Sequence, residues 1–247
     1  VPFTPTPFSS SPRSAPSEFR QIILLRMERF HSLSAVDQVE RVVYSFNVPQ
    51  RYTNLEYIDA GSQGVVASAY DSVDNTPVAI KKILNPIART GCAIRTIREF
   101  TLLSTLNHPN IVKHLAVFTP QEDEQSFRDV YVVMELMKNS LREIIDKVRL
   151  DHKNQSFFIY QILCAVNHLH RQGIIHRDLK PSNIAVDEKG VIKVLDFGLA
   201  RLFDKNAAAQ MTGHVSAREY RAPEILLGLH SYSEKVDIWS IGCIFAE

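Results

Sequence analysis

Two short segments in the second half of the chain carry polar and charged side chains at a close, ordered spacing. Residues 176–183 read HRDLKPSN, and residues 196–198 read DFG. Asp178 can accept the proton of a hydroxyl group and orient its oxygen, and Lys180 can neutralise charge on a phosphoryl group in transfer. Asn183 and the aspartate of the second segment can ligate a metal ion that bridges to phosphates. These residue types at this spacing indicate phosphoryl transfer, which needs positioning and charge neutralisation more than covalent chemistry.

A turn in the first half of the chain could hold the phosphates that such a transfer requires. Residues 59–66 read DAGSQGVV, and glycine lets backbone N–H groups approach a phosphate closely. Taken alone, this turn fits an ordinary hairpin without a ligand equally well. Asp59 also stands where the G-x-G-x-x-G pattern has its first glycine. The candidate phosphate-binding residues of the turn are Gly61, Ser62, Gln63 and Gly64.

A lysine and one more carboxylate complete the candidate site. Residues 78–81 read VAIK, and a lysine at this place on a strand can reach ATP phosphates if a carboxylate holds it. Glu99, on the helix expected to follow, is the natural partner. The candidate catalytic residues are Asp178, Lys180, Lys81 and Glu99, and the candidate metal ligands are Asn183 and Asp196.

The secondary structure expected to position these residues changes from strands in the first part of the chain to helices in the second. From about residue 138 the pattern is mainly helical, with an amphipathic helix at 157–170. Before it, a helix is expected at 93–106, among strands at 52–58, 65–70, 78–83, 111–118 and 130–134. A strand-rich part followed by a helix-rich part predicts an α+β fold with two lobes.

We expect three regions along the chain. Residues 1–50 form a disordered segment or extension that leads into the domain, and the first 18 residues are expected to be disordered because they are rich in Pro, Ser and Thr. Residues 51–137 form the first lobe and a hinge, and residues 138–247 form the second lobe. Residues 236–245 are apolar on nearly all sides, so they should form a helix buried in a larger structure. The second lobe is therefore expected to be truncated, and the chain to be poorly stable when expressed alone.

Charge and cysteine content narrow the partners and the compartment. The net charge of +1 gives no electrostatic case for nucleic acid or a membrane surface, and no apolar run reaches the length of a membrane span. The three cysteines are far apart and odd in number, which indicates reduced thiols in a cytosolic or nuclear protein. We therefore expect neither nucleic acid nor a membrane among the partners.

From about residue 51 to the last residue, the chain resembles the eukaryotic protein kinases. Residues 129–137 (DVYVVMELM) resemble the hinge of mitogen-activated protein kinases. Residues 117–121 (VFTPQ), 150–152 (LDH) and 174–184 (IIHRDLKPSNI) are similar to the c-Jun N-terminal kinase branch. The resemblance implies a protein-kinase fold with a β-rich N-lobe and an α-rich C-lobe.

The same resemblance implies an activity and a setting. It implies a stress-activated Ser/Thr kinase that uses ATP and Mg²⁺ and phosphorylates protein substrates with proline after the acceptor. An upstream MAP kinase kinase would activate it, in the cytoplasm and the nucleus. Met134 would guard the back of the ATP pocket, and backbone groups of Glu135 and Met137 would bind adenine. The remaining nucleotide-binding residues implied by the resemblance are Val66, Ala79, Lys81, Asn183 and Leu195.

Activation in this family uses a Thr-x-Tyr sequence, and here the tyrosine is missing. Thr212 is present, but His214 takes the place of the tyrosine. A phosphorylated threonine would pair with arginines and order the loop around it. The resemblance therefore implies activation through Thr212 alone, with a regulatory arginine cluster of Arg95, Arg98, Arg177 and Arg201.

Other departures keep alternatives open. Ala217 replaces a threonine that contacts the catalytic loop in Ser/Thr kinases, and Glu219 replaces an aromatic residue near the expected proline pocket. The alternative is a pseudokinase or nucleotide-binding interaction protein of the same fold, and a third interpretation is a non-functional gene fragment. The complete set of metal-binding and phosphate-binding residues favours catalysis. Asp237 also matches the helix residue that anchors the catalytic loop in kinases.

Overall fold

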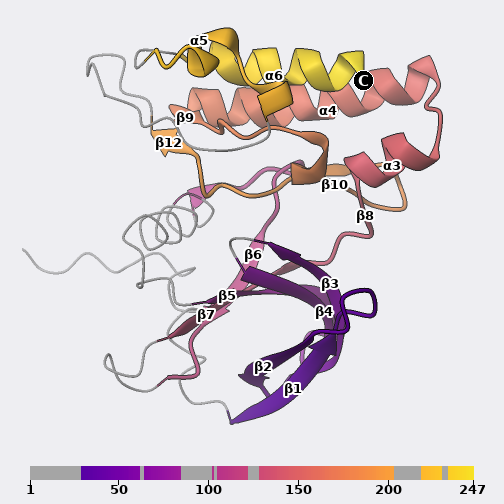
Figure 1. Cartoon of the computed structure of the whole chain (residues 1–247), viewed down its shortest axis with the longest axis vertical. Helices are drawn as coiled ribbons and strands as arrows, with labels where there is room; N and C mark the ends of the chain where they lie inside the picture. Colours follow the sequence, from indigo (N-terminus) through magenta and orange to yellow (C-terminus); the bar gives the residue numbers. More distant parts are fainter. Residues whose placement is uncertain are drawn as a thin grey trace, which may run out of the picture.

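The computed structural model describes residues 29–61, 64–84, 102, 105–121, 128–202, 218–229 and 233–247. The described chain forms two parts, one built of strands and one dominated by helices (Figure 1). The β-rich part comes first along the chain, and the α-rich part contains the C-terminal end (Figure 1). The predicted α+β, two-lobed fold is confirmed. No helix among the described ranges has the length and apolar character needed to cross a membrane.

A five-stranded antiparallel sheet forms the centre of the N-lobe, with strand order β3-β4-β5-β7-β6. In β4, residues 65, 67 and 69 are buried and their neighbours are more exposed, as expected for a strand with one face in a core. All five predicted strands exist, with ends shifted by a few residues. Their bounds are β3 Tyr52–Gly61, β4 Gly64–Asp71, β5 Thr76–Leu84, β6 His114–Phe118 and β7 Asp129–Glu135.

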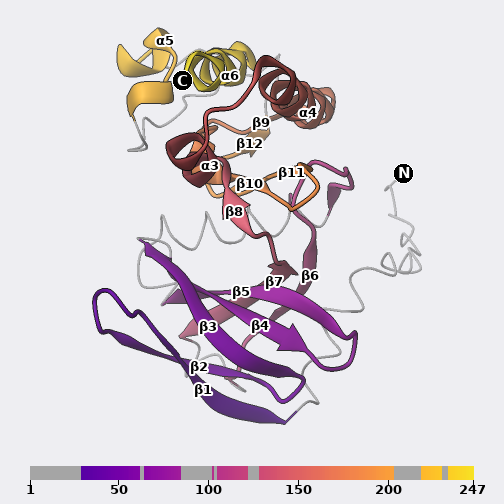
Figure 2. The same ribbon diagram turned by 90° about the vertical axis from the view of Figure 1, so that its right-hand side faces the viewer.

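A hairpin of β1 (Phe30–Val36) and β2 (Val43–Pro49) packs against this sheet (Figure 2). Within the region expected to be a disordered segment or an extension, residues 30–36 and 43–49 therefore form strands. Phe46 is fully buried beside Tyr131, with ring centroids 6.1 Å apart, and Lys82 Nζ donates to the backbone oxygen of Ser45 at 2.7 Å. The hairpin is held mainly by these contacts with strands far along the chain, which a local pattern does not reveal.

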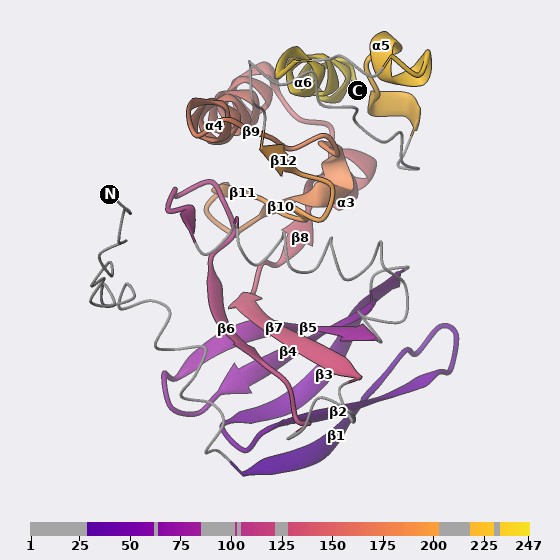
Figure 3. The ribbon, with the colours of Figure 1, turned by 90° about the vertical axis from the view of Figure 1, so that its left-hand side faces the viewer.

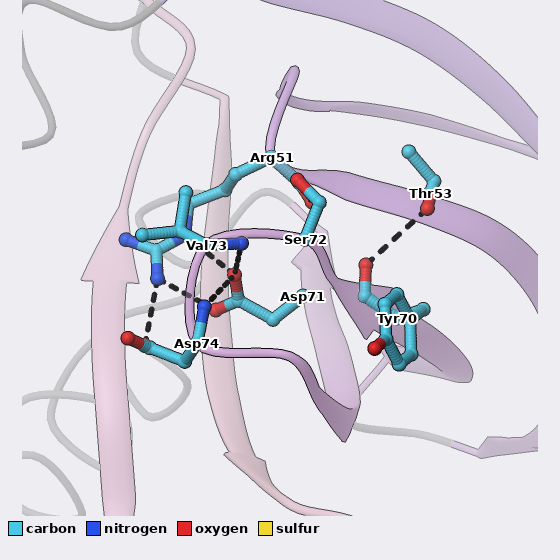
Figure 4. A network of polar contacts seen from close by, with 7 residues as sticks. All are labelled: Arg51, Thr53, Tyr70, Asp71, Ser72, Val73 and Asp74. Atoms are coloured by element: carbon cyan, nitrogen blue, oxygen red, sulfur yellow. Dashed lines mark hydrogen bonds and ion pairs between the residues drawn. The ribbon is translucent and has the colours of Figure 1, made fainter.

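A polar network fastens the start of β3 to the turn between β4 and β5 (Figure 4). The Arg51 guanidinium donates to both carboxylate oxygens of Asp71, at 2.9 and 2.8 Å, and to Asp74 at 2.7 Å. Asp71 Oδ1 also accepts from the backbone N–H groups of Val73 and Asp74. The Ser72 hydroxyl donates to the Arg51 backbone oxygen at 2.9 Å. The bidentate pair with a buried carboxylate sets the geometry of this end of the sheet.

The C-lobe is built around the long helix α4 (His152–Arg171), which contains the helix predicted at 157–170. Asp151 caps it by accepting from the backbone N–H of Asn154 at 2.8 Å. The final helix α6 (Lys235–Ala246) lies against α4 (Figure 1). It buries Val236, Ile241 and Ile244, whereas Ile238, Trp239 and Phe245 are about half exposed. The remaining elements are β8 Asn139–Ser140, α3 Leu141–Lys147, β9 Ile174–Ile175, η2 Pro181–Asn183, β10 Ile184–Val186, β11 Ile192–Val194, β12 Arg201–Leu202, η3 Arg218–Tyr220 and α5 Pro223–Leu226.

The two lobes meet where β10 and β11 face the five-stranded sheet (Figures 2 and 3). Backbone hydrogen bonds fasten this junction: Val194 donates to Asn110 at 2.9 Å, and Val112 donates to Val194 at 3.1 Å. Met134, at the end of β7, packs against the hydrophobic core of the C-lobe. The chain therefore passes between the lobes next to the strand that leads into the DFG segment. The helix predicted at 93–106 lies mostly outside the described residues.

Candidate active site

The catalytic loop between β9 and β10 brings Asp178, Lys180 and Asn183 together. Asn183 donates through Nδ2 to the backbone oxygen and to Oδ2 of Asp178, both at 2.9 Å. Lys180 Nζ lies 3.3 Å from the same Oδ2. Asp178 and Asn183 are both largely buried. The amide of Asn183 therefore fixes the Asp178 carboxylate in one orientation, and Lys180 supplies positive charge beside it.

Asp237 of α6 holds the backbone at the start of this loop. It is fully buried, and its two carboxylate oxygens accept from the backbone N–H groups of His176 at 2.9 Å and Arg177 at 2.8 Å. The His170 ring contacts the same carboxylate at 2.8 Å. Arg177 has a φ of 72°, a region that side chains other than glycine seldom adopt. The bonds to Asp237 offset the cost of this backbone shape and place the next residue, Asp178.

The DFG segment is attached to the same loop by its backbone. Leu195 donates its N–H to the Asn183 oxygen at 2.8 Å, and the Leu195 oxygen lies 2.9 Å from Nε2 of His176. Phe197 is fully buried and meets the His176 ring edge to face, with centroids 4.9 Å apart. Asp196 follows Leu195 directly, with a φ of 57°. The two candidate metal ligands, Asn183 and Asp196, thus stand on segments that hydrogen bonds hold side by side.

Electrostatics at this site follow from the buried carboxylate of Asp178, the partly buried carboxylate of Asp196 and the charge of Lys180. Burial raises the pKa of the Asp178 carboxyl above its ordinary value, and the nearby charge of Asp196 raises it further. Lys180 and His176 oppose that rise. An added divalent cation would favour the ionised form of both carboxyl groups. In the described part of the chain no three His, Cys, Asp or Glu side chains form a group that could hold a metal ion.

The turn between β3 and β4 closes on two glycines with different surroundings. Gly61 and Gly64 face each other across the strand pair. Gly64 has a φ of 141°, and a Cβ atom there would lie 2.0 Å from the Lys82 backbone oxygen. A Cβ atom at Gly61 would meet nothing within 4 Å. The backbone geometry at position 64 therefore requires glycine. Ser62 and Gln63, between them, lie outside the described residues.

The remaining nucleotide-binding candidates lie on β4, β5 and β7. Lys81 of β5 is paired with Val66 on one side and Val132 on the other, which places it in the middle of the sheet. Ala79 stands opposite Met134. Glu135 and Met137 follow along the connection to the C-lobe, and Leu195 lies after β11 on the far side of the junction. Glu99, the expected partner of Lys81, lies outside the described residues.

The regulatory candidates are only partly described. Arg201 of β12 pairs with Ile175 of β9, two residues before Arg177, so two members of the expected arginine cluster stand on neighbouring segments. Arg95, Arg98 and Thr212 lie outside the described residues, as do His214 and Ala217.

Two polar residues of the site were missed by reasoning from the sequence. Lys193 of β11 forms a 2.7 Å ion pair with Glu135, and His114 of β6 stands opposite Met134 in the sheet. Burial lowers the pKa of His114 to about 4, and the charge of Lys81 acts in the same direction. Neither residue belongs to a motif. Their surroundings come from pairings between distant strands, which no local spacing reveals.

Comparison with known proteins agrees with this geometry. Residues 52–247 match the protein kinase domain family. The chain is 53% identical over 219 residues to GLH-binding kinase 1 of Caenorhabditis elegans, which covers 89% of the chain and 56% of that protein. It is 50% identical to the stress-activated protein kinase JNK of Suberites domuncula (82% of the chain, 55% of the relative). The corresponding protein of Drosophila melanogaster is 49% identical (82% and 54%). The chain spans about half the length of these relatives, and it belongs to the protein kinase family, in the stress-activated c-Jun N-terminal kinase branch.

Proposed function

We propose that the protein transfers the γ-phosphate of ATP to serine or threonine in protein substrates, within stress-activated MAP kinase signalling. The observation that carries this proposal is the hydrogen-bonded unit of Asp178, Asn183 and Leu195. These hydrogen bonds support Asp178 as the proton acceptor, with Asn183 and Asp196 as the metal ligands. The relatives named as stress-activated kinases support the signalling context.

Each residue of the site has a definite task in this proposal. Asp178 accepts the hydrogen bond of the substrate hydroxyl and orients its oxygen toward the phosphorus atom. Lys180, 3.3 Å from that carboxylate, neutralises charge that develops on the transferred group. Lys81 holds the phosphates from the N-lobe side. Mg²⁺, when bound through Asn183 and Asp196, would neutralise the β- and γ-phosphate oxygens.

Partners and regulation complete the proposal. The substrates are proteins whose acceptor precedes proline, and an upstream MAP kinase kinase activates the enzyme through Thr212 alone. The location is the cytoplasm and the nucleus. Arg177 and Arg201, on adjacent segments, support a phosphate-binding cluster near the loop. His214 in place of a tyrosine leaves one phosphorylation site in that motif.

A transfer assay with labelled ATP and Mg²⁺ tests the proposal. Two peptides would serve as substrates, identical except that one contains Ser-Pro and the other Ser-Ala. The enzyme would be protein phosphorylated at Thr212, and a Thr212→Ala variant would be the matched control. We expect transfer to Ser-Pro in preference to Ser-Ala, and strong loss in the variant. Binding of ADP without transfer to either peptide would favour the pseudokinase alternative. Equal transfer to both peptides would refute proline direction alone.

A further inference from the structure

Glu135, the residue after Met134 at the end of β7, forms an ion pair with Lys193 of β11. Nζ of Lys193 lies 2.7 Å from Oε2 of Glu135, and the side chains are 17% and 31% exposed. Lys138 forms an equally short ion pair with Glu188, but its side chains are 63% and 73% exposed. Solvent and salt screen an exposed pair strongly, so the pair at Glu135 has much the greater capacity to hold a fixed geometry.

The strand that carries Lys193 is anchored on both sides of that residue. Asn110 donates through Nδ2 to the Ile192 oxygen at 3.0 Å, and its own backbone oxygen accepts from Val194 at 2.9 Å. Gln161, buried on α4, accepts from the Ile192 N–H at 3.1 Å through Oε1. Because buried hydrogen bonds hold the residues before and after Lys193, its ammonium group extends from a rigid base.

The ion pair therefore crosses between the lobes at the place where the nucleotide would sit. β11 leads directly into Leu195 and Asp196, one assigned to the nucleotide pocket and the other to the metal. Glu135 belongs to the connecting segment whose backbone is assigned to adenine. A carboxylate clamped by Lys193 limits rotation of the backbone to which it is attached, and a preorganised backbone binds a planar ligand with less loss of freedom.

We infer that Lys193 is a positioning residue for adenine recognition, which acts by fixing Glu135 and the backbone of the hinge. This inference rests on the proposed function, because it requires adenine to bind at that backbone. It concerns the nucleoside part of ATP and leaves the transfer step to Asp178 and Lys180. The affinities for adenosine and for ADP should therefore fall together when the pair is broken.

Direct binding measurements on the purified protein distinguish this role from a general structural one. In Lys193→Met, we expect the dissociation constants of adenosine and of ADP to rise by the same factor, about fivefold. Lys193→Arg should restore wild-type affinity. Lys81→Met should weaken the binding of ADP and leave the binding of adenosine unchanged, because that lysine is assigned to the phosphates. The kcat of Lys193→Met should stay within about twofold of the wild-type value, with the change confined to KM for ATP.

The control is Lys138→Met, which removes the exposed pair of equal length near the same segment. We expect wild-type adenosine affinity in that variant. Glu135→Gln, which keeps the side-chain shape, tests the same ion pair from its other partner if Lys193→Met folds poorly. Wild-type adenosine affinity in both Lys193→Met and Glu135→Gln, or an equal loss in Lys138→Met, would overturn the inference. A wild-type protein that binds no ADP would instead overturn the proposed function.

Discussion

The catalytic loop and the turn between β3 and β4 are both assigned to phosphates, but they are built in opposite ways. In the loop, buried side chains form the supporting hydrogen bonds. Asn183 donates to the Asp178 carboxylate, and Asp237 accepts from the backbone N–H groups of His176 and Arg177. In the turn, the shape depends on the backbone, and Gly64 is required because its Cβ would collide with the Lys82 oxygen. The loop therefore depends on side-chain chemistry and the turn on the absence of a side chain.

This difference has a consequence for how each region responds to substitution. In the loop, a group can lose its chemical role and leave the fold intact, because Asp178 is separate from the residue that supports it. In the turn, the backbone shape that would hold phosphates requires that residue 64 has no Cβ atom. A single added methyl group at Gly64 should therefore disturb both the fold and phosphate binding. Substitutions matched in size can separate these two kinds of dependence.

The largest effect on stability is expected at Asp237. Its buried carboxylate accepts two backbone N–H groups and contacts the His170 ring, so Asp237→Asn would place amide hydrogens against donors. We expect a loss of about 3–5 kcal/mol in the free energy of unfolding, measured by urea denaturation. The matched control is Asp187→Asn. Asp187 also accepts two backbone N–H groups, but in a more open turn, and the loss there should be about 1 kcal/mol. Equal losses would mean that Asp237 is only an ordinary turn carboxylate.

The glycine pair should give the next largest effect. Gly64→Ala combines a positive φ with contact against a backbone atom, and we expect a loss of about 2–3 kcal/mol in the free energy of unfolding. Gly61→Ala has open space and should change it by no more than about 0.5 kcal/mol. The same urea titration measures both variants. Similar values for the two would contradict the close approach of Gly64 to Lys82.

His114 of the N-lobe is ionisable and partly buried, and a change of pH should reveal its contribution to stability. The pKa of His114 is about 4 in the folded protein, below the ordinary value of 6.5. Above pH 6.5 both folded and unfolded states are neutral, so the group has no effect. As the pH falls toward 4, the unfolded state takes up a proton first, and stability should decrease by at most about 3 kcal/mol. Unfolding titrations across this range should show a shallower decrease in His114→Gln. An unchanged slope would show that His114 does not carry the effect.

The smallest effect is expected at the start of α3. The Ser140 hydroxyl accepts from the Glu143 N–H at 3.2 Å, and the Glu143 carboxylate accepts from the Ser140 N–H at 2.8 Å. Ser140→Ala breaks half of this reciprocal cap, which should lower the free energy of unfolding by about 1 kcal/mol. Ser140→Asp keeps an acceptor at the cap and should recover most of it. A loss of the same size in both variants would exclude the cap as the cause.

The same comparison explains how much could be predicted from the sequence. The proximity of Asp178, Lys180 and Asn183 could be expected from the sequence, because the three lie within eight consecutive residues. Their roles in phosphoryl transfer stay predictions. The strands of the sheet could be predicted from strand-like stretches such as residues 65–70 and 78–83, which follow a turn that contains glycine. The β1–β2 hairpin could not be predicted, because it is held by contacts between residues far apart in the sequence. Phe46 packs against Tyr131, and Lys82 donates to the backbone oxygen of Ser45. The pair of Lys193 and Glu135 joins residues far apart in the chain, and neither signals the other. Lys81 with Glu99, and Thr212 with its arginines, stay predictions.

Replacing Asp178 by Asn tests most directly whether this loop performs phosphoryl transfer. Turnover with a Ser-Pro protein substrate, ADP binding in the presence of Mg²⁺ and the free energy of unfolding would be measured on both proteins. We expect kcat to fall by about 10²–10⁴-fold, with ADP binding within about twofold and with stability maintained, because the buried carboxyl is replaced by a neutral group of the same shape. Equal turnover in the two proteins, or no turnover in a wild-type protein that binds ADP and carries phosphate at Thr212, would contradict the assignment of Asp178.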